Sequence, residues 1–262
     1  MAVPDVVFIV PYRDRPTHLE RFARYFETCI RPRTDLGVVD VLVCNQCDGR
    51  SFNRGAMKNI GVGYLRHKYP RHYRNITCVF HDVDSIPLDT VKLDYTTVAG
   101  VVKHLYGFSY SLGGIVAMKC GDFERCGGFP NHWGWGYEDN ALQMRCKKAG
   151  ISIDRSGMID VKDYTQIERV DMTEDKTVWT RYVSPNEVLR YIDGTSEGIG
   201  DVHGVVYSRR GCFLNVINFS TRYEPEPLVK YSSQLKDFMG NNVIGWVKKN
   251  YARKTMSLMF SS

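Results

Sequence analysis

The apolar positions in the first third of the chain follow two spacings in turn. Val6–Tyr12 is an almost continuous β-rich apolar run, typical of a strand buried on both faces, and 38–44 and 76–80 are similar. Between these runs, apolar residues recur three and four positions apart over 19–30 and 57–65, which places them on one face of a helix. Such a strand-helix-strand-helix-strand series predicts a parallel sheet with helices on both faces.

The second half of the chain is less regular but contains one clear helix. We expect it over Glu138–Lys148, because its last turn is basic and Gly150 stands where a C-terminal cap belongs. Ser51 and Asn53 are candidate N-caps of the earlier helix. No repeat or linker divides the chain, so we predict one α/β domain with a mixed sheet over residues 1–262. Further strands are expected over 151–153, 202–207 and 213–219.

The composition is that of an ordinary globular chain, with 43% hydrophobic and 24% charged residues. This excludes a disordered, a collagen-like and a small disulfide-rich protein. The longest apolar runs are strand-sized, well below the roughly 18 to 20 residues that cross a bilayer, and the first residues do not form a secretory signal. We therefore expect a soluble, cytoplasmic protein, in the host cytoplasm if a virus encodes it.

The net charge of +6 is concentrated near the C-terminus. Leu228–Ser262 carries six Lys and Arg residues against one acid, Asp237, so the rest of the chain is almost neutral. This excludes a nucleic-acid-binding stripe. Apolar residues such as Trp246 and Phe260 alternate with the lysines. Two interpretations follow, a helix packed on the domain or a segment that makes peripheral contact with an anionic membrane.

The eight cysteines have irregular spacing and do not identify a compartment. The close pair Cys44 and Cys47 has no second such pair and no nearby histidine pair, so a zinc site is not expected. A redox pair would open a helix after a strand, whereas the residues after Cys47 read as a loop, so we interpret Cys44 and Cys47 as buried or loop thiols.

Asp82-Val83-Asp84 directly follows the third expected strand. Carboxylates two positions apart on an extended segment point the same way, and their oxygens favour hard cations such as Mg²⁺, Mn²⁺ or Ca²⁺. In a parallel sheet, ligands bind at this carboxyl end of the strands. A solvated acidic turn and a metal-dependent phosphatase are the other interpretations of this motif alone.

The strongest signal is the segment Trp133–Asp139, which reads WGWGYED. Tryptophans beside glycines are costly in a loop unless their faces are used, and aromatic faces suit the apolar faces of sugars and bases. Glu138 and Asp139 open the expected helix, whose dipole they complement. The same dipole favours the ionised carboxylate, which can accept a proton from a substrate hydroxyl.

Arginines follow the first two expected strands. Val10–Arg15 reads VPYRDR and ends the first strand, and Phe52–Arg54 ends the loop after the second. Arginine forks suit diphosphates, and an aromatic ring can stack on a base. An ion-pair cluster of Arg13, Asp14, Arg15 and Arg54 explains the same residues.

In chain order these motifs are VPYRDRxxHL, Asn45-Gln46, FNRG, FHDVDSIP, Gly113-Gly114 and GGFPNxWGWGxED. Together they resemble the β1,4-galactosyltransferase family of inverting, metal-dependent glycosyltransferases with the GT-A fold. The resemblance covers residues 5–155 well and continues more weakly to about 220. It implies a Rossmann-like mixed sheet flanked by helices. Residues 1–90 would be the nucleotide-binding half, 91–225 the acceptor and catalytic half, and 226–262 the basic tail.

The resemblance also implies a role for each matching position. Asp84, with Asp82 nearby, would hold Mn²⁺, or Mg²⁺, on the diphosphate of a UDP-sugar. Asp139 would be the catalytic base of a single inverting displacement. The acceptor-binding residues would be Trp135, Glu138 and Asn140. The donor-binding residues would be Pro11, Tyr12, Arg13, Arg15, Phe52, Arg54, Val83, Asp84, Ser111, Gly113, Gly114 and Trp135.

The chain departs from the family pattern at several places. Asn140 stands where a third acidic residue is usual. Ser111 replaces a tyrosine that limits the donor pocket of galactose-transferring members, which leaves room for an N-acetyl group or a different sugar. Met158–Val161 contains no counterpart of the family's metal-binding histidine. We also expect no membrane anchor or stem, which animal members have. Candidates for the missing ligand are Asp160, Asp163 and His203.

We therefore predict a glycosyltransferase, of a soluble viral or bacterial type, that moves galactose or a related hexose from UDP to a glycan hydroxyl. One alternative is another GT-A transferase that uses an N-acetylgalactosaminyl, glucosyl or xylosyl donor. A second is a nucleotide-sugar- or glycan-binding protein without catalysis, which the missing histidine favours. The presence of Asp84, Glu138 and Asp139 favours an enzyme.

Overall fold

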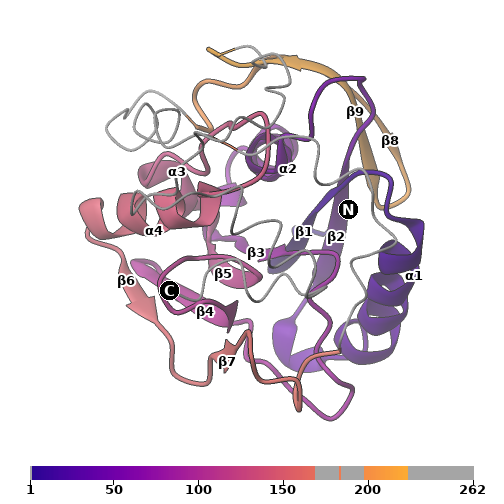
Figure 1. Ribbon diagram of the computed structural model, residues 1–262, viewed down its shortest axis with the longest axis vertical. Helices are drawn as coiled ribbons and strands as arrows, with labels where there is room; N and C mark the ends of the chain where they lie inside the picture. The colour runs from indigo at the N-terminus through magenta and orange to yellow at the C-terminus, as the bar shows by residue number, and fades with distance from the viewer. Residues whose placement is uncertain (1, 169–182, 184–197, 224–262) are drawn as a thin grey trace, which may run out of the picture.

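Three parallel strands form the centre of the sheet. β1 (Val6–Tyr12) lies between β2 (Val39–Gln46) and β3 (Thr77–His81) and is parallel to both. α1 (Pro16–Tyr25) and α2 (Arg54–Lys68) connect them, as the apolar spacing predicts. The computed structural model describes residues 2–168, 183 and 198–223, so the expected basic tail lies outside the described residues (Figure 1).

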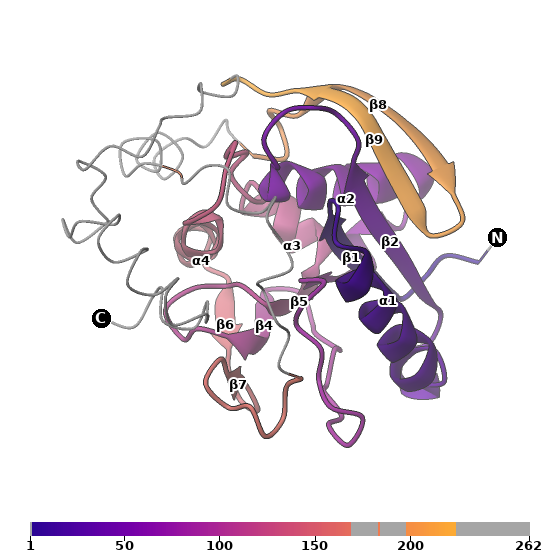
Figure 2. The same cartoon turned by 45° about the vertical axis from the view of Figure 1, so that its right-hand side comes forward.

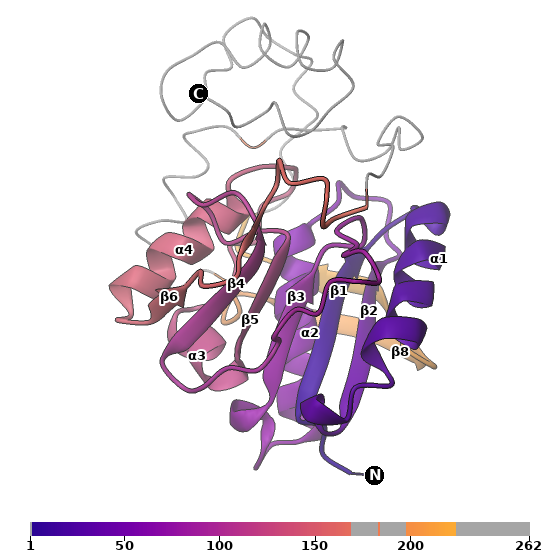
Figure 3. The ribbon, with the colours of Figure 1, turned by 90° about the horizontal axis from the view of Figure 1, so that it is seen from below.

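The remaining strands make the sheet mixed. The order is β6-β4-β5-β3-β1-β2-β9-β8, with β7 beside β4. The part from β6 to β2 can be followed in Figure 3. β5 is antiparallel to both of its neighbours, and β9 is parallel to β2 but antiparallel to β8, with which it forms the hairpin at one edge (Figure 2). The bounds are β4 (Val101–Gly107), β5 (Ile115–Lys119), β6 (Ser152–Asp154), β7 (Ile159–Asp160), β8 (His203–Arg210) and β9 (Phe213–Ser220).

Helices cover both faces of this sheet. The odd residues Val7 and Ile9 of β1 pack with α2, α3 and α4, whereas its even residues pack with α1. α1 continues into a π-helical turn, and two short 3-10 turns complete the described helices. The bounds are α3 (Cys120–Arg125), α4 (Glu138–Lys148), the π-helical turn (Phe26–Ile30) and the 3-10 turns (Thr34–Leu36 and Tyr73–Asn75). In the described part of the chain, none of the helices has the length and apolar character needed to cross a bilayer.

Helix ends follow the expected signals. The side chain of Asn53, and not that of Ser51, caps α2 by accepting a hydrogen bond from the amide of Ala56 at 2.9 Å. α4 has the predicted bounds, and Gly150 follows it with a φ of 66°, the left-handed conformation of a C-terminal cap.

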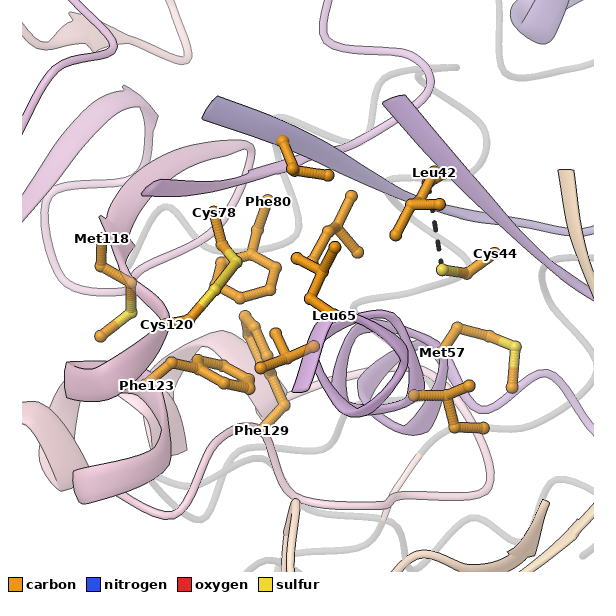
Figure 4. Packing of buried hydrophobic residues seen from close by; sticks show 14 of the residues in the cluster. Leu42, Cys44, Met57, Leu65, Cys78, Phe80, Met118, Cys120, Phe123 and Phe129 are labelled. Atoms are coloured by element: carbon orange, nitrogen blue, oxygen red, sulfur yellow. Dashed lines mark hydrogen bonds between the residues drawn. A yellow bond between two sulfur atoms is a disulfide. The ribbon is translucent and has the colours of Figure 1, made fainter. Parts of the chain in front are cut away.

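The core contains a disulfide that no sequence pattern predicts. Cys78 on β3 is bonded to Cys120 at the start of α3, among Phe80, Phe123 and Met118 (Figure 4). The pair is 42 positions apart, and neither cysteine belongs to a close-spaced motif, so spacing gave no signal. Cys44 and Cys47, the close pair interpreted as thiols, are both free.

The segments that follow β1, β2 and β3 lie at one edge of the sheet. β1, β2 and β3 are parallel, so the residues after Tyr12, Gln46 and His81 lie at the same edge. β5 is antiparallel to β3 and pairs Ile115 with His81, which brings the preceding Gly113-Gly114 turn there as well. Ligands of open α/β sheets bind at this carboxyl edge.

Candidate active site

Arg54, the first residue of α2, contacts three carboxylates. Its guanidinium is paired with Asp82 and Glu138, and its Nη1 lies 3.5 Å from Oδ2 of Asp139. Burial alone would lower the pKa of Arg54, but the three carboxylates outweigh it and raise that pKa well above its usual value. One side chain thus joins the acidic motif after β3 to the acidic motif at the start of α4.

Lys58 lies one helical turn further along α2 and is almost completely buried. Its Nζ is 3.5 Å from Oδ1 of Asp82 and 3.7 Å from Oδ1 of Asp139, and it lies over the ring of Phe129 at 4.3 Å from the centroid. Lys58 lies outside the sequence motifs and was not predicted as a site residue. The signal is the four-residue spacing from Arg54, which places both cations on one face of the helix.

The two carboxylates after β3 have different surroundings. Both oxygens of Asp82 accept hydrogen bonds from Arg54, and although burial opposes it, Arg54 and Lys58 hold the pKa of Asp82 well below its usual range. Asp84 accepts a hydrogen bond from Arg15 through Oδ2 at 3.1 Å, while its Oδ1 has only Ser85 Oγ at 3.5 Å. Asp84 therefore keeps one oxygen without a cationic partner among the described residues.

The expected ion-pair cluster forms only in part. Arg15 and Arg54 pair with the carboxylates after β3. Arg13 instead faces the exposed Asp14, with 3.6 Å between Nε and Oδ2, and donates a hydrogen bond to the carbonyl of Arg50. Arg13 is therefore not part of the central cluster.

Backbone conformation places the two acids of α4. Gly136 has a φ of 120° and Tyr137 a φ of 66°, so the chain turns sharply just before the helix. This turn lets the amide of Gly136 donate to Oε2 of Glu138 at 3.2 Å. Burial works against ionisation of Glu138, but the charges of Arg54 and Lys58 hold its pKa below the usual range.

Asp139 differs from its neighbour. Burial outweighs the two cations and, together with the charges of Glu138 and Asp82, raises the pKa of Asp139 to about 6. Any favourable effect of the helix dipole does not offset this burial, but Asp139 is still ionised above about pH 6. Its Oδ1 is buried and has no hydrogen-bond partner among the described residues. An oxygen in this state is suited to accept a proton from a bound hydroxyl group.

The Gly113-Gly114 turn fits tightly against both acidic motifs. A Cβ on Gly113 would lie 2.3 Å from Oδ2 of Asp139, so only glycine allows this approach. The amide of Leu112 donates to the carbonyl of Asp139 at 3.1 Å, and the amide of Asp82 donates to the carbonyl of Gly114 at 3.0 Å. The turn thereby fixes the two motifs relative to each other.

The two tryptophans of the WGWGYED segment have separate uses. Trp133 is buried, stacks on Phe219 with 5.1 Å between centroids, and donates from Nε1 to Thr221 Oγ1 at 3.1 Å. Its face is thus used inside the protein, which corrects the expectation that both rings serve a ligand. Trp135 is only partly buried, and its carbonyl accepts from the amide of Val183 at 3.0 Å.

Buried amides hold the segment before this loop against α2. The Nδ2 of Asn59 donates to the carbonyl of Phe129 and to Oδ1 of Asn131, both at 2.8 Å. The Nδ2 of Asn53 donates to the carbonyl of Asn131 at 3.1 Å. These partners were not predicted, because an isolated asparagine has no spacing signal.

The other predicted site residues lie nearby with varied exposure. Tyr12, Phe52 and Asn140 are partly exposed, and Asn140 donates to the carbonyl of Tyr110 at 3.4 Å. Tyr12 accepts from the amide of Arg15 at 3.2 Å. The side chains of Pro11, Val83 and Ser111 are buried and offer little surface to a ligand.

The three candidates for a further metal ligand have different positions. Asp160 lies on β7, opposite Gly107 of β4. Burial, and then the charges of Asp84, Asp82 and Asp160 among others, raise the pKa of Tyr106, so all three carboxylates are within electrostatic range of this tyrosine. Across residues 2–168, 183 and 198–223, no three His, Cys, Asp or Glu residues are arranged to hold a metal by themselves.

The other two candidates are less suitable. Asp163 binds the hydroxyl and amide of Thr165 within its own turn. His203 is on β8, separated from β3 by β1, β2 and β9, so its proposal as a ligand is wrong.

Comparison with known proteins agrees with the order of these motifs. Residues 1–96 match the N-terminal region of glycosyl transferase group 7, and residues 93–171 match the family described as N-terminal domain of galactosyltransferase. Chinese hamster (Cricetulus griseus) β1,4-galactosyltransferase 4 is 32% identical over 179 residues, which cover 63% of this chain and 49% of that protein. The chain thus spans about half the length of such relatives.

Two further comparisons extend over more of the chain. The Caenorhabditis elegans xylosylprotein 4-β-galactosyltransferase is 27% identical over 243 residues, covering 80% of this chain and 76% of that protein. The catalytic domain of Drosophila β1,4-galactosyltransferase 7, solved with xylobiose, superposes with a TM-score of 0.63 at 23% identity. That match covers 81% of this chain and 93% of the solved one and confirms the predicted fold. A mutant of the Drosophila enzyme was solved with manganese, UDP-Gal and xylobiose.

Proposed function

Because the chain belongs to glycosyltransferase group 7, the family of the β1,4-galactosyltransferases, and has its GT-A fold, we propose that it is an inverting glycosyltransferase. It would move a sugar from a UDP-sugar to a hydroxyl group of a glycan. The observation that carries this proposal is Asp139, whose buried Oδ1 has no hydrogen-bond partner among the described residues and lies at the same sheet edge as Asp82 and Asp84.

Asp139 would act as the general base. Its Oδ1 takes the proton of the acceptor hydroxyl while that oxygen attacks the anomeric carbon of the donor sugar. The bond from the anomeric carbon to the diphosphate breaks, and its electron pair leaves with UDP. One displacement from the opposite side inverts the configuration, and it needs one base and not the carboxylate pair of a glycosidase. Glu138, Asn140 and Trp135 would then orient the acceptor.

The donor diphosphate would be bound by Arg15 and by a divalent cation, Mn²⁺ or Mg²⁺. Such an ion offsets the negative charge that develops on the departing nucleotide. Asp84 fits as its ligand, because Oδ1 is a hard oxygen with no cationic partner among the described residues. Asp82 fits less well, since both of its oxygens are bound to Arg54. Asp160 is the best placed candidate for a further ligand.

Galactose is the first donor sugar to test, and a xyloside the first acceptor. The relatives named above are galactosyltransferases, and the nematode and Drosophila proteins are associated with xylosylprotein and xylobiose. Ser111 is small and buried at the position where the resemblance predicts a larger side chain. This favours keeping N-acetylgalactosamine, glucose and xylose donors in the test.

We expect the protein to release UDP from one of these four UDP-sugars when an acceptor and Mn²⁺ are present, and to stop when EDTA is added. The measurement is UDP release with xylosides and mixed glycans as acceptors, alongside calorimetric binding of UDP. Tight UDP binding without turnover on any acceptor would support the binding-protein alternative. No UDP binding would contradict the proposed function.

Gly113→Ala should lower the transfer rate about 10- to 100-fold, because the new Cβ displaces the base and misplacement by about 1 Å costs this much. The rate is measured at saturating UDP-sugar, because Gly113 is also among the predicted donor-binding residues. Gly63→Ala in α2 is the matched control, since nothing lies within 4 Å of its Cβ. Equal rates for both variants would show that the contact between Gly113 and Asp139 does not matter.

A further inference from the structure

We propose that Lys58 is a positioning residue that keeps the Asp139 carboxylate ionised and directed towards the acidic motif after β3. The proposal rests on the role of Asp139 as the base, and it adds a residue that none of the sequence motifs contains. It assigns a function to a lysine that is almost completely buried. Burying an ammonium group is costly unless nearby negative charge compensates for it.

The contacts of Lys58 identify what compensates for its burial. Its Nζ lies 3.5 Å from Asp82 Oδ1 and 3.7 Å from Asp139 Oδ1, and both distances are longer than a strong hydrogen bond. Lys58 therefore acts mainly through its charge. It is also the cation next to Oδ1, the proposed proton-accepting atom, whereas Arg54 lies beside Oδ2.

The charges that face Asp139 show why removal of Lys58 should favour the protonated carboxyl group. Arg54 and Lys58 face it from α2, Asp82 from the end of β3, and Glu138 from its own helix. These two cations and two anions give a net charge of zero around Asp139. Without Lys58 the net charge is −1, and the buried carboxylate is repelled by its surroundings. The protonated form, which cannot act as a base, is then favoured.

Phe129 accounts for the position of the lysine but not for its charge. The ammonium lies 4.3 Å from the ring centroid, so a long apolar side chain of similar length can occupy the same space. Lys58→Met consequently separates packing from charge, and Lys58→Arg restores the charge. Lys58→Gln is a second neutral variant in case the methionine variant does not fold.

The first test needs no enzymatic activity. In metal-free buffer, the unfolding free energy is compared for the wild type and Asp139→Asn from pH 4 to 9, and the pair is repeated in the Lys58→Met and Lys58→Arg backgrounds. The pKa of Asp139 is raised in the folded protein to about 6. Its ionisation therefore destabilises the fold, and the wild type should lose stability relative to Asp139→Asn between about pH 4 and 6 and then level off.

In the Lys58→Met background this loss should continue to a pH about one to three units higher, the usual effect of one nearby charge. In the Lys58→Arg background the loss of stability should end at about the same pH as in the wild type. Identical curves in the methionine background and the wild type would overturn the proposal. Because the test needs no turnover, it can be read even if the proposed function fails.

The second test uses the transfer reaction. The acid limb of kcat/KM should move to higher pH in Lys58→Met and return in Lys58→Arg, while UDP affinity in EDTA stays constant. A purely structural role would lower the rate at every pH without moving the limb. That result would also overturn the proposal.

Discussion

Asp139→Asn should lower the rate of sugar transfer about 10²- to 10⁴-fold, the contribution typical of a general base, and leave UDP affinity almost unchanged. The substitution preserves the shape of a side chain packed on Gly113 and removes its ability to take a proton. Single-turnover rates and calorimetric UDP binding measure the two quantities. Asp40→Asn is the matched control, because Asp40 lies near the start of β2, at the opposite end of the strand from the site.

Asp139 also determines the expected pH dependence of kcat/KM. A base must be ionised, and burial raises the pKa of Asp139 to about 6. The kcat/KM of the wild type should therefore fall as the pH drops below about 6, because this quantity reports groups of the free enzyme. An Asp139→Asn variant that retains more than a tenth of the rate, or a wild type without this acid limb, would contradict the assignment.

Arg54→Met should reduce the unfolding free energy at pH 7 by about 3 to 5 kcal/mol, the usual cost of removing one partner from a buried ion pair. The variant leaves Asp82, Glu138 and Asp139 without their shared guanidinium. Urea denaturation measures the difference. The control is Arg31→Met, which breaks an exposed pair with Glu27 and should cost only about 0.3 to 0.5 kcal/mol.

The decrease in unfolding free energy caused by Arg54→Met should depend on pH. Ion pairing lowers the pKa of Asp82 and Glu138 in the fold, so both add stability above their unfolded pKa values and lose it as the pH falls. The gap between the wild type and Arg54→Met should narrow below about pH 4, where carboxylates of unfolded chains protonate. A gap under about 1 kcal/mol at pH 7 would show that water replaces the guanidinium without the cost expected of a buried pair.

Elements with strong local signals were predicted well. The bounds of α4 agree with the sequence because a carboxylate pair, a basic last turn and Gly150 mark both ends. β1 agrees because a strand buried on both faces needs a continuous apolar run. The position of Asp82 and Asp84 at this edge follows from the parallel order of the strands. Glu138 and Asp139 reach it through the Gly113-Gly114 turn and their pairing with Arg54, which the strand order does not predict.

What was missed depends on contacts between distant segments. Lys58 reads as a surface lysine of an amphipathic helix until Asp82 and Asp139 are placed beside it. Trp133 looks like a ligand-contacting ring until β9 brings Phe219 against its face. Asn59 and Asn131 form one hydrogen bond across 72 positions, which no local pattern can indicate.

Because of the bond between Cys78 and Cys120, the unfolding free energy of this protein depends on the redox potential of its surroundings. The bond closes a covalent loop of 42 positions that contains both Asp82–Asp84 and Gly113-Gly114. Closing a loop of this size removes unfolded-state entropy worth about 3 to 4 kcal/mol. A glutathione-buffered cytosol keeps such thiols reduced, whereas a secretory lumen oxidises them. Folding of the same polypeptide is therefore more favourable in an oxidising compartment, where the disulfide forms, than in a reducing one, where the two thiols stay free.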